Sequence, residues 1–188
     1  MSSTETICDA LEKIGKNKHR RAMLDFFCEN GVERWETWLQ LEMAKYMSDN
    51  LAQNWWIESK YEVDRRTQSE KKHRHIDLVF RTPNSSTVHY GAVEMKVRNY
   101  PEYSIGNVMK DLRTIAQIKR AQWNFRSVHA LAIFLYSNTS SSYRARAEEL
   151  GEIVNLGPYT CAVFGWESPG LGDANQVAFG AWVNQALN

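Results

Sequence analysis

The spacing of apolar residues predicts helices in the first part of the chain. Apolar positions recur at helical intervals over residues 3–29, which predicts one or two helices, and again over residues 32–50. One stripe of the later region is formed by Trp35, Trp38, Leu39, Glu42 and Tyr46. Glu42 is the only charged residue on that stripe, whose other members are aromatic or aliphatic.

Three strand-like segments follow, at residues 54–63, 75–82 and 87–97. The small polar residues 84–86 (NSS) favour a turn between the second and third segments. In the third segment, TVHYGAVEMKV, Glu94 and Lys96 share one face of a strand that is otherwise apolar. Burying a charge is costly unless the charge is paired or bound to something. These two side chains therefore need a partner.

The remaining pattern alternates helices and strands. The elements it predicts are a helix at 103–122, a strand at 128–138, a helix at 140–153, a strand at 159–167 and a helix at 175–187. The almost continuous apolar run at 128–138 is typical of an interior strand that is covered on both faces. We expect an α/β fold in which a mixed central sheet is flanked by helices on both sides, in a single domain over residues 1–188.

The turn sets the register of the second and third strands. If they pair about residues 85 and 86, Asp77 and Glu94 stand opposite each other, because both pairs of residue numbers sum to 171. Their Cβ atoms would then be roughly 5 Å apart. Two carboxylates at this distance repel unless a proton or a cation lies between them. Mg²⁺ is bound in proteins by one or two carboxylates with waters and substrate phosphate.

Lys96 stands one strand step from Glu94, at about 6–7 Å, where an amine could orient a water or offset charge on a phosphate. A second interpretation is a cross-strand cluster of ion pairs on a solvent-exposed face. For Glu42 the second interpretation is a surface carboxylate that pairs with Lys45 or Arg34.

This constellation resembles the PD-(D/E)XK nuclease superfamily, which has the restriction-endonuclease-like fold. The superfamily carries an Asp on the second core strand, here HIDLVF, and (Asp/Glu)-x-Lys on the third, here VEMKV. Its αβββαβ core corresponds to residues 32–138, with N-terminal helices and a C-terminal αβα extension outside the resemblance. Ile76 stands before Asp77, where the named pattern often has Pro.

The resemblance implies a metal-dependent nuclease that hydrolyses phosphodiester bonds, with DNA as the first expectation and RNA left open. Asp77 and Glu94 would hold Mg²⁺ or Mn²⁺ with the Met95 carbonyl, and Glu42 would bind a second ion or a metal-bound water. Lys96 would position the attacking water. The alternative is a catalytically silent domain of this fold that binds nucleic acid or protein, or that serves as a subunit of a larger complex.

The segment RRTQSEKKHRH is the most polar stretch and is expected to form a loop between strands. Its basic residues could contact phosphates next to the strand of Asp77, although solvated charge runs are common. His75 shares the face of Asp77. In some members of the superfamily polar residues of the following helix reach the site, which makes Gln117 and Lys119 candidates, with an exposed helix face as the alternative. The basic residues of the segment are Arg65, Arg66, Lys71, Lys72 and Arg74.

Composition narrows the class without identifying the function. Of 188 residues, 43% are hydrophobic and 24% charged, and the net charge of +1 means that nucleic-acid binding would depend on a local patch. Three scattered cysteines argue against a disulfide framework or a cysteine-rich zinc site. We see neither a signal peptide nor an apolar run of about 20 residues. We therefore expect a soluble cytoplasmic protein with no membrane partner; a homodimer or a partner subunit stays open.

Overall fold

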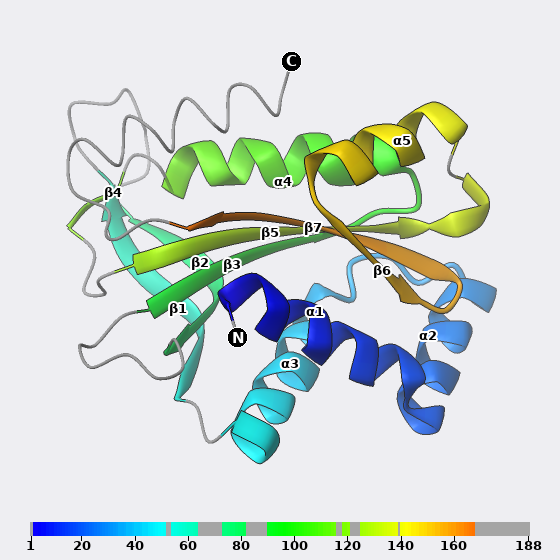
Figure 1. The fold of residues 1–188 in the computed structure, drawn as a ribbon, viewed down its shortest axis with the longest axis horizontal. Helices are drawn as coiled ribbons and strands as arrows, with labels where there is room; N and C mark the ends of the chain where they lie inside the picture. Colours follow the sequence, from blue (N-terminus) through cyan, green and yellow to red (C-terminus); the bar gives the residue numbers. More distant parts are fainter. Residues whose placement is uncertain are drawn as a thin grey trace.

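The computed structural model describes residues 2–51, 54–63, 73–81, 90–115, 118–120, 125–138 and 140–167. Within this part of the chain, seven strands form one mixed sheet in the order β4-β1-β2-β3-β5-β7-β6. Helices cover both faces of the sheet, with α1 and α3 on one side and α4 and α5 on the other (Figure 1). The expected α/β architecture is confirmed.

The N-terminal region forms two helices because Asn17 interrupts it. Asn17 has an extended backbone that ends the first helix, and its side chain accepts the amide hydrogens of His19 and Arg20 at 3.1 and 3.2 Å to cap the second. The elements of the first half are α1 (Ser3–Lys16), α2 (Lys18–Glu29), α3 (Glu36–Leu51), β1 (Trp55–Val63), β2 (His73–Arg81) and β3 (Tyr90–Val97).

Two predicted helices of the second half are too long, because each prediction runs into a short strand. The helix predicted at 103–122 ends at Ile115 and is followed by β4, and the helix predicted at 140–153 ends at Leu150 and is followed by β6. The helix predicted at 175–187 lies outside the described residues. The elements are α4 (Pro101–Ile115), β4 (Ile118–Arg120), β5 (Phe125–Leu135), the 3₁₀ turn η1 (Tyr136–Asn138), α5 (Ser141–Leu150), β6 (Glu152–Leu156) and β7 (Tyr159–Glu167).

The sheet combines an antiparallel meander with a parallel crossover. Strands β1, β2 and β3 pair antiparallel, β3 pairs parallel with β5, and β5, β7 and β6 pair antiparallel. The connection between the parallel strands contains α4, which packs on both of them. Residues 128–134 of β5 are buried throughout, as the continuous apolar run predicts.

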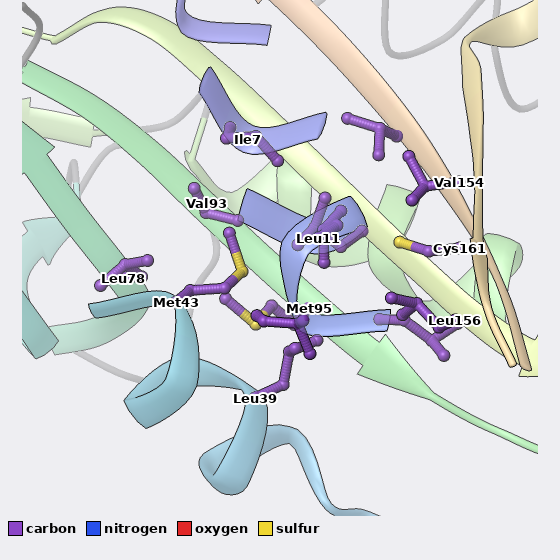
Figure 2. Close-up of a cluster of buried hydrophobic side chains, with 14 of the residues drawn as sticks. Ile7, Leu11, Leu39, Met43, Leu78, Val93, Met95, Val154, Leu156 and Cys161 are labelled. Atoms are coloured by element: carbon purple, nitrogen blue, oxygen red, sulfur yellow. The ribbon is translucent and has the colours of Figure 1, made fainter. Parts of the chain in front are cut away.

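The main core lies between the sheet and the helices α1 and α3. Figure 2 shows labelled side chains of α1, α3, β2, β3, β6 and β7 meeting there, and β5 contributes as well. On β3 the contributors are Val93, Met95 and Val97, so the alternation of the strand turns Glu94 and Lys96 to the face covered by α4. The labelled members of the core are Ile7, Leu11, Leu39, Met43, Leu78, Val93, Met95, Val154, Leu156 and Cys161.

None of the helices in the described part of the chain is long and apolar enough to cross a membrane.

Gly91 lies near the start of β3, before Glu94 and Lys96, and it pairs with Phe80 on β2. A methyl group at Gly91 would overlap the Phe80 ring and come within 2.9 Å of the Ser127 hydroxyl oxygen. The fully buried Phe80 ring therefore occupies the space that a side chain at position 91 would need.

We predict that Gly91→Ala lowers the free energy of unfolding by about 1–3 kcal/mol, because overpacking forces the Phe80 ring and its neighbours to move. Gly106→Ala is the control, since Gly106 lies in α4 with open space around it. Alanine there should leave stability unchanged or raise it by about 0.5–1 kcal/mol through helix propensity. Urea unfolding measures both. Equal stabilities of the two variants would contradict the assigned packing.

His129 is fully buried on β5, where its Nε2 lies 3.1 Å from the Thr4 hydroxyl on α1. Burial lowers the pKa of His129 to about 3, because the charged imidazolium would lose its hydration. The folded state therefore holds the neutral ring at pH values where the unfolded chain binds a proton.

We predict that this group makes the protein less stable as the pH falls from about 6.5 toward 3, by at most about 1.4 kcal/mol per pH unit. The loss is absent above that window, since the ring is neutral in both states. His129→Gln removes the titration and should flatten the dependence of unfolding free energy on pH. Urea titrations at pH 4, 5, 6 and 7 compare the slopes, and parallel curves for wild type and variant would refute the assignment.

Candidate functional site

The register between β2 and β3 agrees with the hairpin prediction. The paired residues run from Arg81–Tyr90 to Leu78–Val93, and each pair of numbers sums to 171. Asp77 and Glu94 occupy the next step, just beyond the last pair. The Asp77 carboxylate there accepts the amide hydrogen of Met95 at 2.7 Å. The Asp77 side chain thus accepts a hydrogen bond from the backbone of β3, just beyond the last residue pair of the two strands.

Helix α4 supplies a partner for the lysine of this site. Lys96 Nζ lies 2.8 Å from a carboxylate oxygen of Asp111 on α4. The Ser104 hydroxyl, also on α4, lies 2.7 Å from the carbonyl oxygen of Lys96 and 3.0 Å from that of Ile133 on β5. Helix α4 therefore contacts both the backbone and the ammonium group of Lys96.

The two strand carboxylates lie where water reaches them poorly. Glu94 is only 5% exposed, and burial raises its pKa well above the usual range. Burial also raises the pKa of Asp77 to about 6, because the hydrogen bond from Met95 and the charge of Lys96 offset only part of the cost. Each carboxylate would bind a proton more readily than it does in water.

Lys96 keeps its positive charge. Burial, the largest single effect, lowers the pKa of Lys96, but the hydrogen-bonded ion pair with Asp111 and the nearby carboxylate charges together outweigh it. The charges of Asp77 and Glu94 act in the same direction as Asp111, and the pKa of Lys96 is raised above its usual value. An ammonium group held in this way is a source of positive charge and not a base at neutral pH.

Two residues of α3 and β1 extend the site beyond the residues predicted from sequence. Glu58 on β1 falls between the pairs Ile57–Leu78 and Ser59–Ile76, which places it opposite Asp77. Its charge contributes to the raised pKa values of both Asp77 and Glu94. The Gln40 side chain on α3 donates from Nε2 to Glu58 Oε1 at 3.4 Å.

Glu42, predicted to complete the site, instead forms an ion pair with Arg20 of α2. The buried side of α3 is centred on Leu39, Met43 and Met47, so Glu42 lies at the edge of that side and faces the neighbouring helix. The predicted stripe was displaced around the helix axis relative to the buried side. Gln40, which the stripe omitted, is the polar residue that the helix buries.

The candidate nucleic-acid contacts are described only in part. Arg65, Arg66, Lys71, Lys72 and Gln117 lie outside the described residues. Arg74 lies on β2, and His75 is an exposed residue of the same strand, two positions before Asp77. The helical placement of Lys119 was wrong: α4 ends at Ile115, and Lys119 belongs to β4, which pairs with β1 at the sheet edge.

Sequence reasoning missed Asp111, Glu58 and Gln40 for physical reasons. Asp111 and Gln40 lie on helices whose packing decides which side chains reach the sheet. The position of Glu58 opposite Asp77 depends on the register of β1 and β2. The residues between these strands, unlike the predicted NSS turn, gave no central pair from which the register could be counted. A glutamate inside a strand-like run was the one signal available for Glu58.

The site has more carboxylates than cationic groups among the described residues, and a bound cation would offset their charge. In the described part of the chain, the charges that act on this site come from the carboxylates of Glu58, Asp77, Glu94 and Asp111 and from the ammonium of Lys96. No three His, Cys, Asp or Glu side chains within the described residues form a group that could hold a metal ion. A cation here would therefore use one or two carboxylates, with carbonyl, water or phosphate oxygens as its other ligands, which is the usual coordination of Mg²⁺.

Comparison of the chain with protein-family models, with curated proteins and with solved structures found no significant match to any of the three.

We predict that Asp77→Asn stabilises the metal-free protein at pH 8 by about 1–3 kcal/mol. Above pH 6 the Asp77 carboxylate is ionised in both states but is disfavoured in the folded one, and two pKa units correspond to roughly 3 kcal/mol. The asparagine oxygen can still accept from Met95. Urea unfolding in EDTA at pH 4 and pH 8 tests this, since the difference should nearly vanish at pH 4.

Asp49→Asn is the matched control, because Asp49 is an exposed partner of Lys45 on α3. It should change the free energy of unfolding by at most about 0.5 kcal/mol at either pH. A wild type that equals or exceeds Asp77→Asn in stability at pH 8 would show that the folded protein does not disfavour this charge.

Proposed function

We propose that this chain is a metal-dependent nuclease of the PD-(D/E)XK type that hydrolyses phosphodiester bonds, with DNA as the first substrate to test. The observation that carries the proposal is the meeting of Asp77 and Glu94 at one level of neighbouring strands. One of these carboxylates is almost fully buried, and the ammonium of Lys96 is close enough to lower the pKa values of both.

The arrangement of elements supports the same proposal. From α3 to β5 the chain follows a helix, a three-stranded antiparallel meander, a helix and a parallel strand, with the added edge strand β4. This order matches the αβββαβ core expected from the resemblance. Asp77 lies on the second strand of the meander, and Glu94 and Lys96 lie on the third.

In this proposal Asp77 and Glu94 hold Mg²⁺ or Mn²⁺ through their carboxylate oxygens, and the Met95 carbonyl is a further candidate ligand. A bound divalent ion supplies Lewis acidity toward a phosphate oxygen and lowers the pKa of a bound water. Binding of a cation would also keep both carboxylates ionised at neutral pH, where burial alone favours their protonation.

The role of Lys96 follows from its protonation. Water attacks phosphorus in line with the leaving oxygen, and the new P–O bond forms as the old one breaks. The attacking water gives a proton to solvent, and the leaving oxygen takes one from solvent. A charged Lys96 does not accept the proton from the water, so we assign it to stabilising negative charge on the phosphate and orienting the water. Asp111 keeps the ammonium group in place through its ion pair.

Cleavage assays test the proposal. Pure protein is incubated with circular DNA, linear DNA and RNA, with Mg²⁺, Mn²⁺ or EDTA. We predict metal-dependent cleavage, and a loss of at least about 100-fold in rate for Asp77→Asn, Glu94→Gln and Lys96→Met. Cleavage of the circular substrate would identify an endonuclease.

Lys45→Met is the matched control for Lys96→Met, because Lys45 is an exposed lysine of α3 with its own carboxylate partner. It should retain the wild-type rate. Wild-type activity of Lys96→Met would refute the assigned mechanism. Tight Mn²⁺ binding by an intact protein that cleaves none of the substrates would favour the alternative, a domain of this fold that binds without turnover.

A further inference from the structure

A pair of aromatic rings lies beside the carboxylates of the site. Trp56 on β1 and Tyr90 on β3 have ring centroids 5.5 Å apart, with ring planes inclined at 67°. Strand β2 lies between β1 and β3 in the sheet, so the two rings meet over β2. Both residues are partly exposed. The rings therefore form part of the molecular surface as well as a contact between strands.

The alternation of the strands puts both rings on the face that carries the carboxylates. On β3, Tyr90 and Glu94 are four positions apart and so share a face. On β1, Trp56 pairs with Val79, which is two positions from Asp77 on β2. The level of Trp56 is thus one strand step, about 6–7 Å, from the level of Asp77.

An exposed arginine continues this row away from the carboxylates. Arg81 lies two positions beyond Val79 on β2 and pairs with Tyr90 on β3. Along this face of β2 the order is therefore a carboxylate at Asp77, the aromatic pair and the guanidinium of Arg81.

This order matches the chemistry of a single nucleic-acid strand. Aromatic side chains stack on the flat face of any unpaired base. The phosphates on either side of a base are negatively charged, which suits a cation held by carboxylates at one end and a guanidinium at the other. In a duplex the base is paired and stacked, and its release costs free energy. The row therefore favours an unpaired base over a paired one.

We propose that Trp56 and Tyr90 bind an unpaired base next to the scissile phosphate, and that Arg81 binds the phosphate on the far side of that base. The substrate is then single-stranded nucleic acid. The inference rests on the proposed nuclease function, which identifies the phosphate at Asp77 as the scissile one. Stacking tolerates every base, so this contact confers little sequence preference.

Binding of fluorescein-labelled oligonucleotides of about 10 nucleotides tests the inference by fluorescence anisotropy. The full chain carries Asp77→Asn, so that the proposed cleavage does not consume the probe, and Mg²⁺ is present. The probes are single-stranded DNA, single-stranded RNA, duplex DNA and a DNA strand that lacks bases. At least one of the single strands should bind about tenfold or more tightly than the duplex and the base-free strand.

Matched variants in this Asp77→Asn background locate the base contact. Trp56→Leu removes a stacking surface and should weaken single-strand binding about tenfold or more, without changing the affinity for the base-free strand. Tyr90→Phe keeps the ring and should bind within about twofold of the background. Trp55→Leu is the control, because Trp55 is an exposed tryptophan of β1 that points to the opposite face. It should bind as the background does.

Arg81→Met separates the phosphate contact from the base contact. It should weaken binding of the single strand and of the base-free strand alike, and lower the slope of log affinity against log salt concentration by about 0.7. Trp56→Leu should leave that slope unchanged. Background affinity of folded Trp56→Leu for single strands would overturn the inference. Equal affinity for base-bearing and base-free strands would overturn it without any change to the aromatic pair, even if Trp56→Leu fails to fold.

Cleavage by the wild type separates failure of this inference from failure of the proposed function. Metal-dependent cleavage of duplex and single strand at equal rates, unaffected by Trp56→Leu, would overturn the inference and leave the nuclease in place. Base-dependent binding of single strands without any cleavage would refute the nuclease and support the base contact. Absence of both nucleic-acid binding and cleavage would overturn both.

Discussion

The hydrogen bond from the Met95 amide to the Asp77 carboxylate joins the two faces of the sheet at one residue. The side chain of Met95 packs in the core beneath the sheet, while its backbone holds a carboxylate of the site. Successive side chains of a strand point to opposite faces, so β3, which buries Val93 and Met95 in the core, directs Glu94 to the other face. The position of the site is therefore a consequence of core packing.

The same arrangement buries negative charge that the surrounding groups offset only in part. Lys96 and the Met95 amide lower the pKa of Asp77, but burial and the neighbouring carboxylates raise it further. Glu94 is the most buried of these groups, and burial raises its pKa well above the usual range. Unlike an ordinary ion-pair cluster on a solvent-exposed surface, this cluster keeps a demand for positive charge. A proton or a bound cation can supply that charge, and the proposed metal-dependent chemistry rests on the second possibility.

How far the sequence could predict this structure depended on the range of the contacts. Pairing about the turn predicted at residues 84–86 gave the register that β2 and β3 have, and apolar alternation predicted the face of Glu94. The short strands β4 and β6 were missed, since three to five residues hold too few repeats to outweigh an adjoining helical pattern. The partners of the site on α3 and α4 depend on helix rotation and packing, which local periodicity does not determine.

The packing of α1 has a consequence for how the chain acquires its structure during synthesis. This helix is made before β6 and β7, which lie more than a hundred residues later in the chain, yet its apolar side packs on both strands (Figure 2). Until the ribosome has released those strands, Leu11 and Ile14 lack their final neighbours. In that interval α2 and α3 can cover only part of the apolar side of α1, and the part left exposed favours aggregation or chaperone binding.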